Sequence, residues 1–88
     1  MTRKEKRALG LLPTQIVGRT RKLCKSGEIT KEMTRKEAAI VVAFAAASDE
    51  ETHDAWEQVE YGSVDLDALL EFIEKLLAIL LPLFLPPT

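Results

Sequence analysis

The sequence has few of the residues on which enzyme chemistry depends. It contains one cysteine and one histidine, Cys24 and His53. A single cysteine cannot form an internal disulfide, which excludes a disulfide-stapled secreted scaffold. The sequence also lacks a serine-centred nucleophile elbow, a glycine-rich phosphate loop and the ligand spacing of a zinc site. We therefore expect a protein that is not an enzyme and has no cofactor or metal.

Both rare residues have a structural interpretation. Cys24 falls on the apolar face of an expected helix, where a cysteine behaves as a small core residue. His53 follows the acidic run 49–51 and precedes Asp54, and together these side chains could hold a cation. Carboxylates at the start of a helix also complement its dipole, and this is the interpretation that we favour.

Length and composition indicate one small folded domain over residues 1–88. A chain of 88 residues has no room for a substrate cleft between two lobes. Its apolar content of 47% is too high for a disordered chain, and its charged content of 30% is too high for a simple membrane span. Residues 1–20 contain no sustained apolar segment, so we expect no signal peptide and a place inside a cell or within a large particle.

The charges are strongly segregated along the chain. Residues 1–36 hold eleven Lys and Arg against three Glu, a balance of +8, whereas residues 37–88 hold one Lys against eleven Asp and Glu, a balance of −10. Such asymmetry suggests an anionic partner for the basic part, or pairing between opposite parts of the same or neighbouring chains. The residues expected to face an anionic partner are Arg3, Lys4, Lys6, Arg7, Arg19, Arg21 and Lys22.

Residues typical of helix starts and helix ends predict an all-α bundle of four or five short helices. Capping boxes are expected at three pairs: Thr2 with Glu5, Thr34 with Glu37, and Ser48 with Glu51. Pro13 separates a basic N-terminal arm or helix, residues 1–12, from an amphipathic helix that ends at Gly27. An alanine-rich segment, 38–47, is the expected central helix. The residues 61–63 should end the next helix, and Asp65 should cap the last one.

The core expected from these helices is modest. Besides Thr20 and Cys24 on the second helix, its larger members are Ile16, Leu23, Ile40, Val42, Phe44, Trp56 and Val59. The C-terminal helix, residues 65–85, offers more apolar surface than these side chains can cover. An exposed apolar area of that size exceeds what a soluble monomer usually shows.

A heptad spacing runs along this C-terminal helix. The residues at alternating intervals of four and three, which we expect to associate with another chain, are Leu66, Leu70, Ile73, Leu77, Leu80 and Phe84. Leu76 and Leu83 widen this seam, while Phe72 and Ile79 lie outside it, so the second half of the helix is apolar nearly all round. Pro82 is expected to kink or loosen the final turn.

Three functions are consistent with these features. The first is a non-enzymatic structural or assembly protein, present in several copies in a virus particle or another large complex and bound to copies of itself or to other proteins. The second is a peripheral membrane protein that inserts 76–85 into one leaflet; this segment is about 15 Å long, against about 30 Å of hydrocarbon. The third is a nonspecific nucleic-acid-binding accessory protein, because the basic part could neutralise phosphates. That part lacks the aromatics used for base stacking, so its contact with nucleic acid would be electrostatic only.

Overall fold

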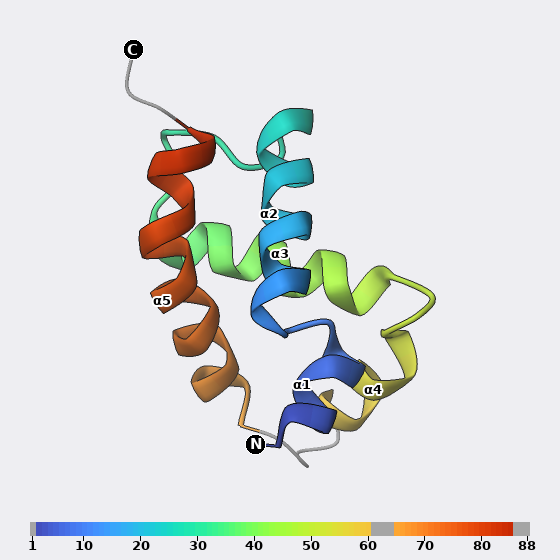
Figure 1. The fold of residues 1–88 in the computed structure, drawn as a ribbon. Coiled ribbons are helices and arrows are strands. Elements are labelled where there is room, and N and C mark those ends of the chain that lie inside the picture. The colour runs from blue at the N-terminus through green and yellow to red at the C-terminus, as the bar shows by residue number, and fades with distance from the viewer. Residues whose placement is uncertain (1, 61–64, 86–88) are drawn as a thin grey trace.

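The computed structural model describes residues 2–60 and 65–85 and confirms the all-α fold (Figure 1). These residues form five helices and no strand. The helices are α1 (Arg3–Leu9), α2 (Pro13–Ser26), α3 (Arg35–Ser48), α4 (His53–Glu60) and α5 (Leu66–Phe84).

Local hydrogen bonds start the helices at three of the expected positions. The Thr34 hydroxyl accepts from the Glu37 amide at 3.1 Å, and the Glu37 carboxylate accepts from the Thr34 amide at 2.9 Å. The same reciprocal pair joins Thr2 and Glu5 ahead of α1. Asp65 caps α5 by accepting from the two amides at 67 and 68. Each bond satisfies an amide that has no partner within its own helix.

Glycine ends the first two helices. Gly27 adopts φ +86° and closes α2 where the sequence predicts. Gly10 adopts φ +76° and ends α1 at Leu9, earlier than the expected limit at residue 12. Both angles lie in the left-handed region that other residues rarely enter. Pro13 is the first residue of α2, where its missing amide leaves no bond unmade.

The expected capping box at Ser48 is wrong. Ser48 belongs to α3, and its hydroxyl donates to the Phe44 carbonyl at 2.9 Å instead of capping a new helix. The Glu51 amide donates to Asp49 at 3.0 Å, so α4 begins only at His53. The expected end of α4 at residues 61–63 lies outside the described residues.

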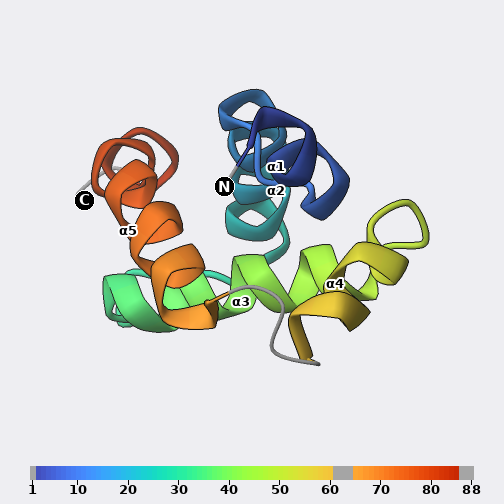
Figure 2. The ribbon, with the colours of Figure 1, turned by 90° about the horizontal axis from the view of Figure 1, so that it is seen from below.

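The helices form two layers. In Figure 2, α2 is seen nearly end-on and α5 runs obliquely beside it, both above α3, with α1 above α4. Helix α5 has its most extensive contacts with α3 and then with α2. The alanines of α3 allow this approach, because a small side chain lets two helix axes come close.

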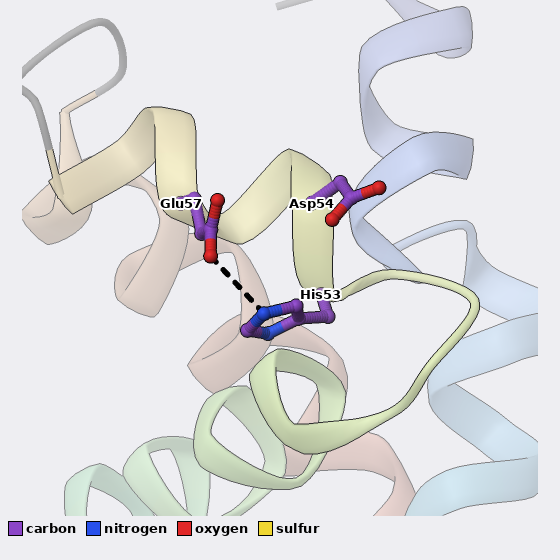
Figure 3. Close-up of side chains that lie close together, drawn as sticks. All are labelled: His53, Asp54 and Glu57. Carbon is purple, nitrogen blue, oxygen red and sulfur yellow. Dashed lines mark ion pairs between the residues drawn. The ribbon is translucent and has the colours of Figure 1, made fainter.

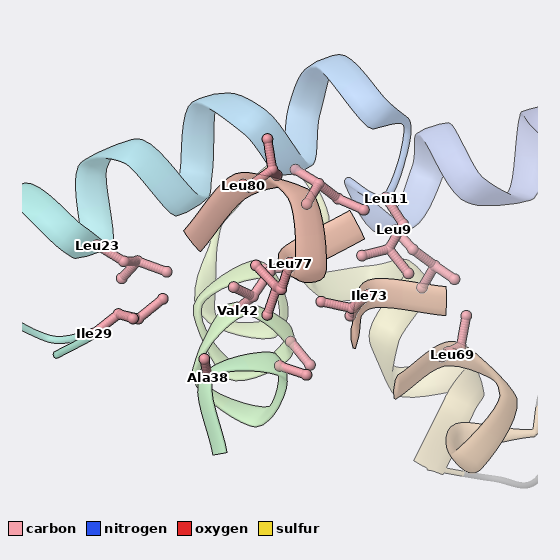
Figure 4. Close-up of a cluster of buried hydrophobic side chains, with 14 of the residues drawn as sticks. Leu9, Leu11, Leu23, Ile29, Ala38, Val42, Leu69, Ile73, Leu77 and Leu80 are labelled. Atoms are coloured by element: carbon pink, nitrogen blue, oxygen red, sulfur yellow. The ribbon is translucent and has the colours of Figure 1, made fainter. Parts of the chain in front are cut away.

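The largest buried side chains come from several elements and meet between α2, α3 and α5 (Figure 4). Those with the least exposure are Leu11, Ile16, Ile29, Leu69, Ile73 and Leu77. Thr20, Leu23, Trp56 and Val59 are also buried, and Cys24 is partly buried, as the helical spacing predicts.

Two residues expected in the core are on the surface. Ile40 is 47% exposed and Phe44 is 74% exposed. The buried stripe of α3 runs through Ala39, Val42 and Ala46, which places residues 40 and 44 on the outer side of the helix. The alanine side faces inward because it permits the closer contact with α5, and the bulky side chains remain outside.

Candidate association surfaces

The seam expected to join chains is largely the chain's own core. Ile73 and Leu77 are fully buried, and Leu80 is 7% exposed. Their side of α5 packs against α2 and α3, so these three residues are internal, which corrects their assignment to contacts between chains. Leu70 and Phe84 are half-buried. Of the six seam residues, only Leu66 at the start of the helix is exposed.

A different side of α5 carries exposed apolar side chains. Ile79 is 65% exposed and Leu83 is 68% exposed, and Leu76 beside them is half-buried. Their intervals of three and four place these residues on one stripe of the helix, which we call the α5 ridge. The signal was present in the sequence as an apolar helix half without a polar side, but spacing alone assigned contacts between chains to the stripe that the chain's own core buries.

An apolar groove lies at the other half of α5. It has a volume of about 520 Å³ and is lined by α3, α4 and the start of α5. Its lining residues are Ile40, Ala43, Phe44, Ala47, Trp56, Val59, Leu66 and Leu70. We call it the α3–α5 groove. Sequence reasoning missed it, because four of its members were expected in the core and two in the α5 seam.

Trp56 holds α4 in place beside this groove. Its indole Nε1 donates to the Leu9 carbonyl at 2.8 Å, a buried bond that links α4 to the end of α1. The Leu9 carbonyl belongs to the last turn of α1, where carbonyls lack partners within the helix. The indole therefore satisfies a buried acceptor and fixes the α4 wall of the groove.

The residues of the expected anionic-partner face have different surroundings. Arg3, Lys4, Arg7, Arg21 and Lys22 are exposed. The other two members make contacts within the chain.

Lys6 lies with its Nζ 4.4 Å from the centre of the Phe72 ring. Arg19 is mostly buried, and its guanidinium lies 3.5 Å from the Asp49 carboxylate. The pKa of Asp49 is lowered, chiefly because the Glu51 amide donates to it, with a smaller attraction from Arg19. Arg19 therefore neutralises an acid of its own chain and does not belong to a face for external anions.

A second cavity lies beside the C-terminal half of α5. It has a volume of about 490 Å³ and lies between that half and the segment that precedes α3. Leu77, Leu81 and Leu85 contribute apolar surface, while Lys31 and Arg35 bring positive charge to the same wall. This end of the molecule is therefore both apolar and basic.

His53 takes part in an exposed cluster on α4 (Figure 3). Its Nε2 lies 3.1 Å from a Glu57 carboxylate oxygen, and Asp54 is close enough for the three groups to share a cation. The acidic run 49–51 is not part of this group. A His–Glu pair one helical turn apart is an ordinary surface interaction, so the cluster alone assigns no metal. Burial raises the pKa of the Cys24 thiol, which keeps it neutral, as suits a packing residue.

Among the helices of residues 2–60 and 65–85, none combines the length and the apolar composition needed to cross a bilayer. Comparisons with protein-family models, with curated proteins and with solved structures give no match. The surfaces described above are thus the basis for a functional proposal.

Proposed function

We propose that this chain is a non-enzymatic assembly protein that binds copies of itself within a larger complex. One observation carries the proposal: of the six large apolar side chains that are exposed among residues 2–60 and 65–85, five lie in or beside two surfaces, the α3–α5 groove and the α5 ridge. Monomeric soluble proteins rarely expose apolar side chains in contiguous patches of this kind. A virus particle is one such complex, in keeping with the small size and polarised charge of the chain.

Energetics favour contacts through whole patches. Burying one Val, Leu, Ile or Phe side chain contributes about 1.5–3 kcal/mol. Association costs about 4–15 kcal/mol in lost translational and rotational freedom. One side chain cannot offset that cost, whereas several that are buried together can. Ile40, Phe44 and Leu66 cluster at one surface and Ile79 and Leu83 at the other, so each surface can bury more than one such side chain at once.

Light scattering behind size-exclusion chromatography tests the proposal on the full chain in detergent-free buffer. We expect a mass above that of one chain, and we expect it to persist at high salt, because salt screens charges but does not weaken apolar contacts. A mass of one chain at every concentration would overturn self-association. Dissociation by salt would contradict an apolar contact, since the contact would then be electrostatic.

A specific observation also favours a second candidate, a peripheral membrane protein. Leu81 and Leu85 line one cavity together with the basic residues Lys31 and Arg35, at the end of α5 that exposes Leu83 on its other side. Apolar anchors next to basic side chains are typical of proteins that bind anionic membrane surfaces. Flotation with liposomes that contain anionic lipid tests this candidate. The candidate predicts that the unmodified chain floats with these liposomes and that Leu83→Asp abolishes flotation. An unmodified chain that does not float with them would reject the candidate.

A further inference from the structure

We infer that the outer side of α1 and α2 binds the phosphate backbone of double-stranded nucleic acid. This side carries four exposed basic residues, which we call the basic face: Lys4, Arg7, Arg21 and Lys25. The inference does not depend on self-association, because the basic face includes no residue of the α3–α5 groove or of the α5 ridge.

On α2, the basic face lies opposite the core. The buried residues Ile16, Thr20 and Leu23 form the inner stripe of this helix. At 3.6 residues per turn, Arg21 and Lys25 fall on the outer side, one turn apart. Their charged groups therefore point away from α3 and α5, against which α2 packs.

Helix α1 is oriented in the same way. Its inner side carries Leu9, which is buried, and Lys6, whose Nζ lies over the Phe72 ring of α5. Helical spacing places Lys4 and Arg7 on the opposite side of α1. Figure 2 shows α1 and α2 in one layer, above α3 and α4, so the cations of both helices belong to the same side of the molecule.

The basic face is not neutralised within the chain. Across residues 2–60 and 65–85, none of its four side chains forms an ion pair. Helix α2 contains no acidic residue, and the one acid of α1, Glu5, is held in the capping box with Thr2. Acidic groups are found at the edge of the face, where Asp49 and Glu51 share a cavity with Lys22. The outer charges thus remain available to an external anion.

The composition of the face favours a polyanion over a protein or a membrane. Protein interfaces have an apolar core, and helices that lie in a membrane surface immerse an apolar side. In the described part of the chain, Val17 is the only large apolar side chain that α1 or α2 exposes. A partner of this face must therefore be held by charge, which is how proteins contact the phosphates of nucleic acid.

A duplex suits the face better than a single strand. Proteins that hold single strands stack the bases on aromatic side chains. Residues 1–43 contain no Phe, Tyr or Trp, so neither α1 nor α2 can supply such a platform. Double-stranded DNA offers dense charge instead, with about one phosphate per 1.7 Å of its axis.

Fluorescence anisotropy of the full chain with a short labelled DNA duplex tests the inference over a range of salt concentrations. We expect binding at low salt and an affinity that falls as salt rises, with a log–log slope of about −0.9 for each phosphate contacted. The double variant Arg21→Gln and Lys25→Gln should reduce the size of this slope by about two.

A matched control removes the same charge elsewhere. Lys36→Gln together with Lys75→Gln changes two exposed lysines on α3 and α5 and should leave the slope unchanged. All four positions are exposed, so both double variants should keep the helical circular dichroism of the unmodified chain. Equal slopes for the two double variants would place the contact elsewhere and overturn the inference.

Three further outcomes separate the alternatives. An unmodified chain that leaves the duplex unbound at the lowest salt, or that floats with anionic liposomes but does not bind the duplex, would overturn the inference. A strong preference between two duplexes of unrelated sequence would contradict contact through the backbone alone. A chain that binds the duplex but has the mass of one chain would support this inference while overturning self-association.

Discussion

The indole of Trp56 donates a buried hydrogen bond of 2.8 Å to the carbonyl of Leu9, which lies 47 residues earlier in the chain. This bond joins the basic α1 to the acidic α4. It places the N-terminal helix against the body of the protein, where the sequence alone left open an arm or a helix.

Trp56→Phe should destabilise the fold and loosen α1. Phenylalanine keeps an aromatic ring but cannot donate, so the Leu9 carbonyl is left buried without a partner. Such a loss costs about 1–3 kcal/mol. Urea denaturation measures it, and limited trypsin digestion should cleave at Arg3, Lys4 or Arg7 sooner than in the unmodified chain. Unchanged stability and cleavage would show that the bond does not hold α1.

Gly18 within α2 and Gly27 at its end should respond in opposite directions to substitution by alanine, as measured by the free energy of unfolding. Gly27→Ala places a side chain at φ +86° and should lower the free energy of unfolding by about 1–2 kcal/mol. Gly18→Ala lies within the helix, has no atom within 4 Å of the new methyl group, and should raise it by about 0.5–1 kcal/mol. Thermal or urea unfolding of both variants provides the comparison. Equal effects of the two substitutions would contradict the assignment of Gly27 as the helix end.

Glu37 should make the fold sensitive to acid. Its pKa is lowered, chiefly by the hydrogen bond from the Thr34 amide. A carboxyl whose pKa is lower in the folded state adds stability above its unfolded pKa, about 4.3, and this stability is lost as the pH falls through the folded pKa. Glu37→Gln keeps an acceptor at this position but removes the charge.

The unfolding free energies of the unmodified chain and of Glu37→Gln, measured across this range, should therefore converge at low pH and separate at neutral pH. Curves that stay parallel throughout would assign no role to the charge. Glu5→Gln is the matched control, because Glu5 occupies the same position in the capping box of α1. It measures the effect of placing a glutamine at that position.

Ile73 and Ile79 lie on the same helix, but their substitution by alanine should lower the free energy of unfolding by very different amounts. Ile73→Ala empties a fully buried position and should cost about 2–5 kcal/mol. Ile79→Ala truncates a side chain that is 65% exposed and should change stability by less than about 0.5 kcal/mol. Ile73→Asp should for the same reason unfold the chain rather than separate chains. Similar unfolding energies for the two alanine variants would contradict the orientation of α5.

Local features of the fold could be predicted from the sequence because they depend on neighbouring residues. The caps at Thr2, Thr34 and Asp65 and the end at Gly27 rest on hydrogen bonds and backbone angles within a few positions. Ser48 misled for the same reason. Its hydroxyl has two local partners in prospect, an amide ahead from which it would accept as a helix cap and a carbonyl one turn behind to which it can donate, and the bond to Phe44 forms.

The orientation of helices could not be predicted in the same way. Helix α5 is apolar nearly all round in its second half, so its sequence does not distinguish the stripe that α2 and α3 cover from the stripe left exposed. Helix α3 combines small and large apolar residues, and close approach favoured the small side. Both apolar surfaces depend on these choices, which is why Phe44 and Ile79 were identified only in the structure.

The most direct test of the central claim is sedimentation equilibrium of the unmodified full chain over a wide concentration range without detergent. Self-association predicts a weight-average mass that rises with concentration above that of one chain. A mass that stays at one chain throughout would contradict the account and leave the groove and the ridge as surfaces for some other partner.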